Sequence, residues 1–306
     1  MTTCRVCSQP LSEKTIEGIR DWEFGAGGEY SYLKCNSCGI HQLHPFPTLD
    51  DLKLAYPDNY TAFIEEKGDR GLLYRIMSLA SEKMFKRSFR NLITPGCKVL
   101  DVGCGNGEFL IKLRKLGASK LVGIDFSEAA VALCNEKGIE TYNGIFTDFQ
   151  QESQSFDAIF MINYIEHVLS PKNELTQAFR LLKPGAKLIG ELPNFASLDR
   201  KLFGRYWGGN HVPRHTFQYD PQSLRKLLVD AGFGNIQIQQ DLNPGHIVIS
   251  IQNWLQRKAP NLANNPKLRF GRMRHFSLML LMLLPLNVLF VLLGRSGVIR
   301  FSAERE

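Results

Sequence analysis

The chain has 306 residues, of which 44% are hydrophobic and 22% are charged. This balance is ordinary for a globular protein, so it excludes a disordered or fibrous chain, and the length allows one large domain or two moderate ones. The net charge of +7 is concentrated in one segment, because residues 242–303 hold eight Lys or Arg residues and no Asp or Glu.

The N-terminal residues contain the first recognisable site. The opening MTTCRVCSQP lacks the regions of a signal peptide, so we expect a cytoplasmic chain with reduced cysteines. Two CxxC pairs, Cys4/Cys7 and Cys35/Cys38, could supply four thiolates in a tetrahedral shell, the usual closed structural Zn²⁺ site. Residues 1–60 are therefore predicted to form a zinc ribbon, with short hairpins between the two pairs.

The rest of the chain alternates between strand-like and helix-like runs. Residues 45–60 have a proline-rich loop or linker composition, and residues 61–94 are predicted as a linker helix because apolar residues recur at helical spacing between Gly71 and Leu92. Beyond residue 94 the alternation predicts an α/β domain, with a mainly parallel sheet covered by helices on both faces. The expected strands are Lys98–Val102, Lys120–Asp125, Phe156–Ile162, Ala186–Leu192, Asn235–Asp241 and Gly297–Ala303, and the expected helices are Glu108–Leu116, Glu128–Lys137, Leu175–Leu182 and Pro221–Ala231.

A glycine-rich loop follows the first strand of this domain, in the stretch VLDVGCGNGEFL from Val99 to Leu110. Glycines are needed where the chain turns sharply and where the backbone approaches a ligand closely. In the dinucleotide pattern the third glycine would stand at Glu108, whose carboxylate would oppose a pyrophosphate, so the loop argues against NAD. Asp125, at the end of the second strand, is placed to accept the hydroxyls of a ribose.

The loop resembles motif I of class I S-adenosylmethionine-dependent methyltransferases, D-x-G-x-G-x-G. Further matches follow in order, at Phe156-Asp157-Ala158, Glu166-His167 and Leu182-Lys183-Pro184-Gly185. The resemblance implies a Rossmann-like methyltransferase domain over residues 95–306, with one antiparallel strand and S-adenosylmethionine as the methyl donor. It also implies that the loop wraps the methionine part of the donor, with Asp101 near the ammonium group. The expected donor-binding residues are Asp101, Gly103, Cys104, Gly105, Gly107, Asp125, Phe126 and Asn163.

Two clusters are candidates for the acceptor side. Ligands of open α/β sheets bind beyond the carboxyl ends of the strands, which places residues 163–167 beside the reactive methyl group. The cluster Tyr206–His215 lies in a loop too long for a plain connection. Because imidazole titrates near neutrality, His215 and His167, with Glu166 beside the latter, are the candidate catalytic residues. For His167, helix capping or a core hydrogen bond is the alternative interpretation.

Three acceptor classes follow from these patterns. The zinc ribbon, the class I core and Pro213-Arg214-His215 together resemble bacterial methyltransferases that modify sugars, which implies a glycan or lipid-linked glycan of cell-envelope polysaccharide biosynthesis. Some quinone O-methyltransferases also resemble the chain and bind a divalent metal through two acids and a His; Asn163, Glu166 and His167 would match, with Asn163 in place of one acid. An RNA methyltransferase is disfavoured and no nucleic acid is expected, because residues 1–60 hold eight acids against five Lys or Arg. The oligomeric state is left open.

Residues 242–296 are predicted as an apolar helical insertion in the methyltransferase domain. Phe276–Leu293 is an apolar run of 18 residues, just long enough to span a bilayer. Gly297–Ala303 resembles the last strand of the sheet, so both ends of the insertion return to one domain and a single crossing is impossible. Pro285 favours a bent, shallow hairpin, peripheral on the anionic inner face of the membrane. The alternative is an ordinary helix packed on the sheet or in a dimer interface.

Overall fold

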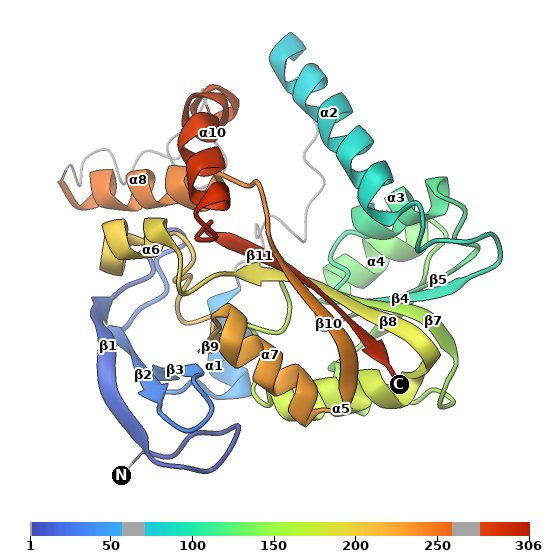
Figure 1. The fold of residues 1–306 in the computed structure, drawn as a ribbon, viewed down its shortest axis with the longest axis horizontal. Coiled ribbons are helices and arrows are strands. Elements are labelled where there is room, and N and C mark those ends of the chain that lie inside the picture. Colours follow the sequence, from blue (N-terminus) through green and yellow to red (C-terminus); the bar gives the residue numbers. More distant parts are fainter. Residues whose placement is uncertain (1, 57–70, 259–275) are drawn as a thin grey trace.

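The computed structural model describes residues 2–56, 71–258 and 276–306, and a seven-stranded sheet forms its centre (Figure 1). The strands of this sheet are β4 (Lys98–Val102), β5 (Lys120–Asp125), β6 (Glu140–Asn143), β7 (Phe156–Ile162), β8 (Leu182–Pro193), β10 (Phe233–Gln240) and β11 (Val298–Arg305). Their order is β10-β11-β8-β7-β4-β5-β6. Neighbouring strands are parallel except at β11, which runs antiparallel to β8 and β10. The expected Rossmann-like sheet with one antiparallel strand is confirmed.

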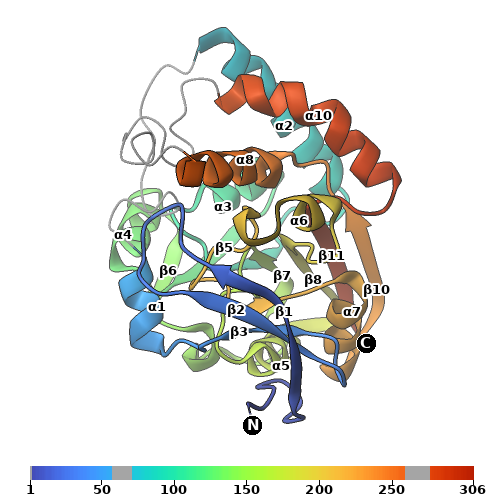
Figure 2. The same cartoon turned by 90° about the vertical axis from the view of Figure 1, so that its left-hand side faces the viewer.

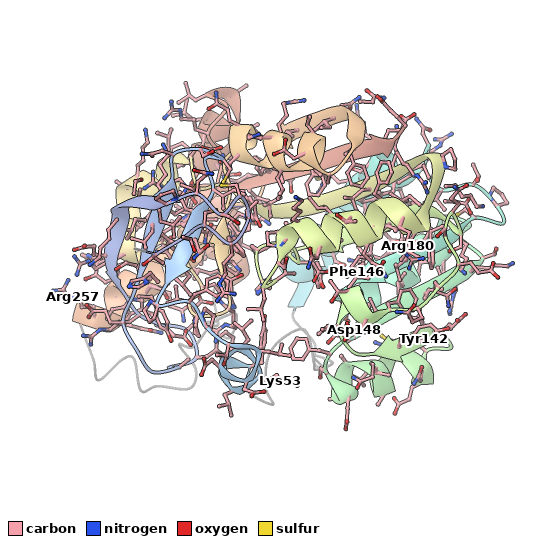
Figure 3. All side chains as sticks on the ribbon, turned by 90° about the horizontal axis from the view of Figure 1, so that it is seen from below. Lys53, Tyr142, Phe146, Asp148, Arg180 and Arg257 are labelled. Atoms are coloured by element: carbon pink, nitrogen blue, oxygen red, sulfur yellow. The ribbon has the colours of Figure 1, made fainter. Side chains whose placement is uncertain are left out.

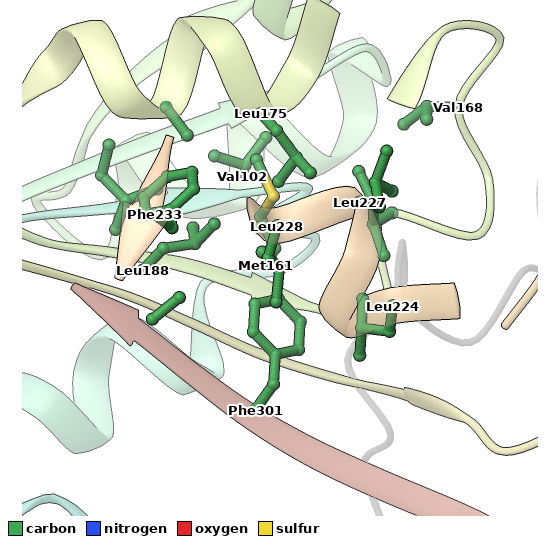
Figure 4. Packing of buried hydrophobic residues seen from close by; sticks show 14 of the residues in the cluster. Val102, Met161, Val168, Leu175, Leu188, Leu224, Leu227, Leu228, Phe233 and Phe301 are labelled. Atoms are coloured by element: carbon green, nitrogen blue, oxygen red, sulfur yellow. The ribbon is translucent and has the colours of Figure 1, made fainter. Parts of the chain in front are cut away.

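Helices cover both faces of this sheet, which explains why its central strands are apolar on both sides. Along β4, Val99 packs into one buried cluster and Leu100 into another, on opposite faces. On the Leu100 face, Leu175 and Leu224 from two helices gather near Phe301 of β11 (Figure 4). The helices of that face are α5 (Pro171–Leu181) and α7 (Pro221–Asp230), and those of the other are α2 (Gly71–Phe89), α3 (Glu108–Lys115) and α4 (Glu128–Glu136).

Elements with a strong apolar pattern have the predicted bounds. The strands β4, β5 and β7 match the expected ranges residue for residue. The edge strand β6 was not predicted, because none of its four residues is buried and it therefore carries no apolar signal. Helix α5 begins at Pro171 and not at Leu175, since proline is well suited to the first turn of a helix.

A second sheet contains strands from both sides of the predicted domain boundary at residue 60. Its strands are β1 (Leu11–Ile19), β2 (Tyr30–Cys35), β3 (His41–His44) and β9 (Phe217–Gln218), paired in that order. The strand β9 belongs to the predicted methyltransferase domain, yet it pairs with β3 of the predicted zinc ribbon. A small buried cluster likewise combines Tyr32 and Leu43 with Trp207 and Val212. The predicted boundary at residue 60 therefore does not separate the two sheets.

Part of the predicted loop at residues 45–60 is a helix, α1 (Leu49–Ala55). Thr48 and Asp51 form a capping box at its start, in which the Asp51 N–H donates to the Thr48 side chain and the Thr48 N–H donates to the Asp51 carboxylate. Leu52 and Ala55 are buried. The prolines around this segment suggested a loop, but the capping box and two buried apolar residues were sufficient to start a helix.

The described residues of the predicted apolar insertion form two helices, α8 (Gly245–Lys258) and α10 (Phe276–Leu292), which contact each other. Helix α8 also contacts α6 (Leu198–Phe203) (Figure 2). The chain then returns to the sheet as β11, as predicted. The hairpin turn expected at Pro285 is wrong, because α10 continues through this residue. The Leu and Met residues on either side are strong helix formers that tolerate the one missing backbone hydrogen bond. Within the described ranges, no helix is both long and apolar enough to cross a membrane.

Candidate active site

A cavity of about 680 Å³ opens at the carboxyl ends of β4, β5 and β7. Its floor is formed by the residues at these ends, and its walls include α1 of the N-terminal part and the first turns of α8. Lys53 of α1 and Phe146, which follows β6, both line it from different parts of the chain (Figure 3). The cavity therefore lies where the sequence predicted ligand binding, but it is bounded by more of the chain than the methyltransferase domain alone.

The predicted glycine loop forms part of the cavity floor. Gly103 and Gly107 both have a φ of about +76°, a conformation that L side chains rarely adopt. A Cβ at Gly103 would lie 2.8 Å from Cδ2 of Tyr164, and a Cβ at Gly107 would lie 2.7 Å from Cδ1 of Ile139. Gly103 lines the cavity and Gly107 caps the N-terminus of α3. Only glycine fits both positions without strain, and at Gly103 the backbone without a side chain faces the cavity.

Asp125 holds its carboxylate at the cavity wall, at the end of β5. Its Oδ2 accepts a hydrogen bond of 2.9 Å from the Gly105 N–H, and its Oδ1 accepts one of 2.9 Å from the Ser127 N–H. Burial raises the pKa of this carboxyl, whereas the two backbone donors lower it. Each oxygen retains acceptor capacity for a ribose hydroxyl. The binding of a ribose by Asp125 stays a prediction, with which these two free acceptor positions are compatible.

The other predicted donor-binding residues divide into two groups. Phe126 and Asn163 line the cavity, together with Gly103 and Asp125. Asp101, Cys104, Gly105 and Gly107 do not. Asp101 is buried, and its pKa is raised well above the usual value by burial and by its acidic neighbours. The Cys104 thiol lies 3.9 Å from Cys134 Sγ, on the core side of the loop. These side chains support the loop and do not reach the cavity.

The cavity continues beyond Asp125 along the segment that follows β6. Gly144, Ile145, Phe146 and Thr147 line this end. The Gln177 side chain of α5 donates a 2.7 Å hydrogen bond to the carbonyl oxygen of Phe149, which fixes the segment against the helix. Backbone and apolar side chains form this wall, so it suits a flat apolar ring beside the ribose-binding carboxylate.

Tyr56, directly after α1, contacts one residue in each half of the cavity: Phe126 in the half that contains Asp125, and His167 in the other half. Its hydroxyl lies 2.8 Å from Nδ1 of His167, and its ring packs edge-on against Phe126 with the centroids 5.1 Å apart. Sequence reasoning missed this contact because it assigned the segment to a linker. The capping-box pattern from Thr48 to Asp51, just before buried Leu52, is the signal that could have revealed the helix.

Three histidines gather in the other half of the cavity. The ring centroids of His167 and His215 are 4.5 Å apart, and those of His211 and His215 are 5.0 Å apart. Burial lowers the pKa of all three well below the usual value, so they are neutral at pH 7. His215 Nδ1 lies 2.8 Å from the carbonyl oxygen of Gly209, which can only accept. Nδ1 therefore carries the proton, and Nε2 of His215 keeps its lone pair.

Glu166 is buried beside these rings. Burial raises the pKa of its carboxyl to about 8, and neither oxygen has a hydrogen-bond partner among the described residues. One donor atom each from Glu166, His167 and His215 lies within 4.8 Å of the others, a set that could share one divalent cation. Asn163, which stands where the quinone-type pattern has a second acid, lines the same cavity with a φ of +49°.

A buried network that the sequence analysis did not identify connects the N-terminal sheet to the histidines. His211 Nε2 accepts a 2.8 Å hydrogen bond from Arg214 Nε, so its Nδ1 carries the proton and donates to Glu23 at 2.9 Å. Arg214 also donates to the Ala55 carbonyl at 2.6 Å and pairs with Asp21 at 2.9 Å. Glu23 and His211 line the cavity. The residue types were visible in the sequence, but no local pattern pairs residues so far apart.

The four cysteines predicted to bind zinc lie together at the edge of the N-terminal sheet. The sulfur atoms of Cys4 and Cys38 are 3.7 Å apart, and those of Cys7 and Cys35 are 3.4 Å apart. A tetrahedral ion with Zn–S bonds of about 2.3 Å needs sulfur atoms about 3.8 Å apart. All four sulfurs lie within 4.8 Å of one another, and no histidine of the described residues joins the group. The spacing therefore fits a closed four-thiolate site.

A family model described as a methyltransferase domain matches residues 57–238. Among curated proteins, the ubiquinone biosynthesis O-methyltransferase of Hahella chejuensis is 35% identical over 115 residues, which cover 35% of this chain and 45% of the relative. The protein of the same name from Maricaulis maris is 29% identical over 150 residues, covering 45% and 59%. The chain thus spans about half the length of these relatives.

Solved structures show the same fold at low sequence identity. A phosphoethanolamine N-methyltransferase 2 from Haemonchus contortus has a TM-score of 0.51 at 16% identity, covering 73% of this chain and 51% of its own. A sarcosine dimethylglycine methyltransferase from Galdieria sulphuraria, named as such provisionally, has a TM-score of 0.51 at 16% identity, covering 76% and 88%. These likenesses concern the fold alone.

Proposed function

The chain belongs to the methyltransferase domain family and is an S-adenosylmethionine-dependent methyltransferase, and we propose that its acceptor is a hydroxyl group of a small molecule bound beside His215. The observation that carries this proposal is the fixed tautomer of His215. Its Nδ1 donates to the Gly209 carbonyl, so Nε2 is unprotonated, and His215 is one of the residues that line the cavity. A neutral imidazole in a buried cavity is the group that a hydroxyl needs as a proton acceptor.

The donor would be held by residues of the sheet edge. In this proposal Asp125 accepts the two ribose hydroxyls, the backbone at Gly103 approaches the methionine part, and the wall at residues 144–147 packs against the adenine. The donor supplies a methyl group on a positively charged sulfur. Tyr56 and Phe126 also line this half of the cavity, with their rings packed edge to face.

The proton balance assigns different roles to the two predicted bases. As the methyl group moves from sulfur to the acceptor oxygen, the hydroxyl proton goes to Nε2 of His215, and the neutral thioether product remains. Nδ1 of His167 is already hydrogen-bonded to the Tyr56 hydroxyl, so we assign His167 to positioning α1 over the cavity. Burial raises the pKa of Glu166 to about 8, but this side chain is not among the residues that line the cavity, so we assign it no contact with the acceptor.

We favour a quinone-type phenol or catechol over a glycan as the acceptor. The relatives with ubiquinone O-methyltransferase names support this choice. The acceptor half is also walled by apolar side chains, namely Ile249, Leu280 and Val298, which suit a flat ring better than a sugar with many hydroxyls. The glycan or lipid-linked glycan implied by the sequence has no support from these relatives and becomes the second arm of the test.

We also propose that Cys4, Cys7, Cys35 and Cys38 hold a structural Zn²⁺. The support is the sulfur spacing, which fits a tetrahedral ion. The site lies outside the cavity, so its role would be to hold the N-terminal sheet together. That sheet supplies Glu23 to the acceptor half.

The test is a methyl-transfer assay with labelled donor and two acceptor sets, one of hydroxylated quinols and catechols and one of nucleotide sugars and lipid-linked glycans. We expect product from the first set, with the label on oxygen. Product from the second set alone would contradict the proposed phenol or catechol acceptor. An N-methylated product would contradict the assignment of His215 as the base that deprotonates a hydroxyl. Turnover lost in EDTA and restored by Mg²⁺ would make Glu166, His167 and His215 a metal site and reject the proton-acceptor role of His215.

A further inference from the structure

The helix α10 exposes a continuous apolar stripe. Its residues are apolar apart from Ser277 and Asn287, and a helix apolar all round is normally enclosed by protein or lipid. Here one side faces outward: Met282 is 72% exposed and Leu292 is 78% exposed. The large exposed side chains run along the whole helix and just beyond it, and most recur at helical spacing: Leu278, Leu281, Met282, Leu286, Val288, Leu289, Leu292 and Leu293.

The neighbouring helices extend this apolar stripe. On α8, which contacts α10, Trp254 and Leu255 are exposed. On α6, which contacts α8, Leu202 is 68% exposed. These three helices lie together along one side of the molecule, away from α5 (Figures 1 and 2). We call the exposed side chains of α6, α8 and α10 the apolar surface.

The exposed charges on the described parts of α6 and α8, and just after α6 and α10, have one sign. Lys201, Arg205 and Arg257 are exposed at α6, just after α6 and on α8, and Arg295 is exposed after α10; Arg257 marks the outer end of α8 (Figure 3). The one acid in the three helices, Asp199, is buried and accepts from the Trp207 indole N–H. Apolar side chains ringed by cations, with a tryptophan at the edge, match an anionic bilayer surface.

We propose that the apolar surface docks on the surface of an anionic lipid bilayer, with α10 lying in the interface. A second copy of the chain would need acidic side chains or a neutral apolar face opposite Arg257 and Arg295, and the same surface on a partner would bring cations against cations. The cavity lining includes Ile249 of α8 and Leu280 of α10. Docking would therefore place part of the cavity wall next to lipid, whichever acceptor binds there.

The experiment is flotation of the full chain with vesicles of phosphatidylcholine alone and with added phosphatidylglycerol. We expect the wild type to float with the anionic vesicles and to be released by salt. The variant Met282→Ser/Leu289→Ser/Leu292→Ser should bind at least about tenfold more weakly, because each substitution removes apolar area from the contact. The variant Leu54→Ser/Val229→Ser also removes exposed apolar side chains, but from α1 and α7, and should float like the wild type.

Retained S-adenosylhomocysteine binding by calorimetry shows that each variant is folded. Three outcomes overturn the proposal: wild type left at the bottom of the gradient, equal flotation of the α10 variant, or equal binding to neutral vesicles. Light scattering can reveal a fourth outcome that would overturn the proposal. A wild-type dimer that the α10 variant converts to a monomer, with no vesicle binding by either, would assign the apolar surface to a second copy.

Discussion

The Nη2 atom of Arg214 lies 2.9 Å from Oδ1 of Asp21, and both side chains are almost completely buried. Asp21 belongs to the N-terminal part, and its carboxylate also accepts backbone N–H groups from Glu23 and Ala26. Arg214 precedes His215 in the acceptor loop. This one ion pair therefore fixes the position of Glu23 against the histidine cluster, and it makes the N-terminal part a structural component of the cavity.

Asp21→Asn should destabilise the protein by about 3–5 kcal/mol, because it leaves the Arg214 charge buried without a partner. Urea unfolding measures the loss. The control is Glu29→Gln, which breaks the exposed pair with Arg20 in the same part of the chain and should cost less than about 1 kcal/mol. Equal effects of the two substitutions would show that the Asp21–Arg214 pair has no special structural role.

His215→Asn should reduce kcat by a factor of about 10² to 10⁴, the usual contribution of a general base. Donor affinity should not change, because His215 does not touch the residues that hold the ribose. His167→Asn should have a smaller effect on kcat and a larger one on donor affinity, since it releases Tyr56 from its 2.8 Å contact. Steady-state kinetics and calorimetry with S-adenosylhomocysteine separate the two effects. A larger kcat loss in the His167 variant would exchange the assigned roles.

The sequence predicted the structural features that depend on a local residue pattern. Apolar runs located β4, β5 and β7, and the left-handed glycines located the loop, because both are fixed by neighbours in the chain. The Glu23–His211 contact joins residues 188 positions apart, and it depends on β3 pairing with β9 across the predicted domain boundary. No periodicity encodes such a pairing. The direction of the Cys104 side chain could not be predicted for a similar reason: its place in the loop was known, but packing against Cys134 sets where the side chain lies.

Removal of zinc should unfold the N-terminal sheet and lower activity even though the metal is far from the chemistry. Purified protein should contain about one zinc per chain, and Cys4→Ser should lower this content and the melting temperature together, because a structural zinc contributes directly to folding. Atomic absorption and thermal unfolding make the two measurements. Cys97→Ser replaces a buried thiol outside the group and should leave the zinc content unchanged. Full zinc content in the Cys4 variant would contradict the four-thiolate site.

The buried carboxyl of Glu23 should make stability depend on pH in a predictable direction. Burial, with Asp21 nearby, raises its pKa from 4.5 to about 8 in the folded state. Between these values the folded chain binds more protons than the unfolded chain, so this group's contribution falls as pH rises from about 4.5 to about 8. Glu23→Gln keeps an oxygen that can accept from His211 but cannot ionise, so it removes this penalty.

The Glu23→Gln variant should therefore be more stable than the wild type at pH 8, with a rise in melting temperature of at least about 2 °C, and the difference should shrink towards pH 5. Thermal unfolding across this range measures it. Glu29→Gln, an exposed carboxyl of the same hairpin, should show no such trend. A wild type that remains the more stable protein at pH 8 would mean that Glu23 is ionised there, stabilised by Arg214 more strongly than burial opposes it.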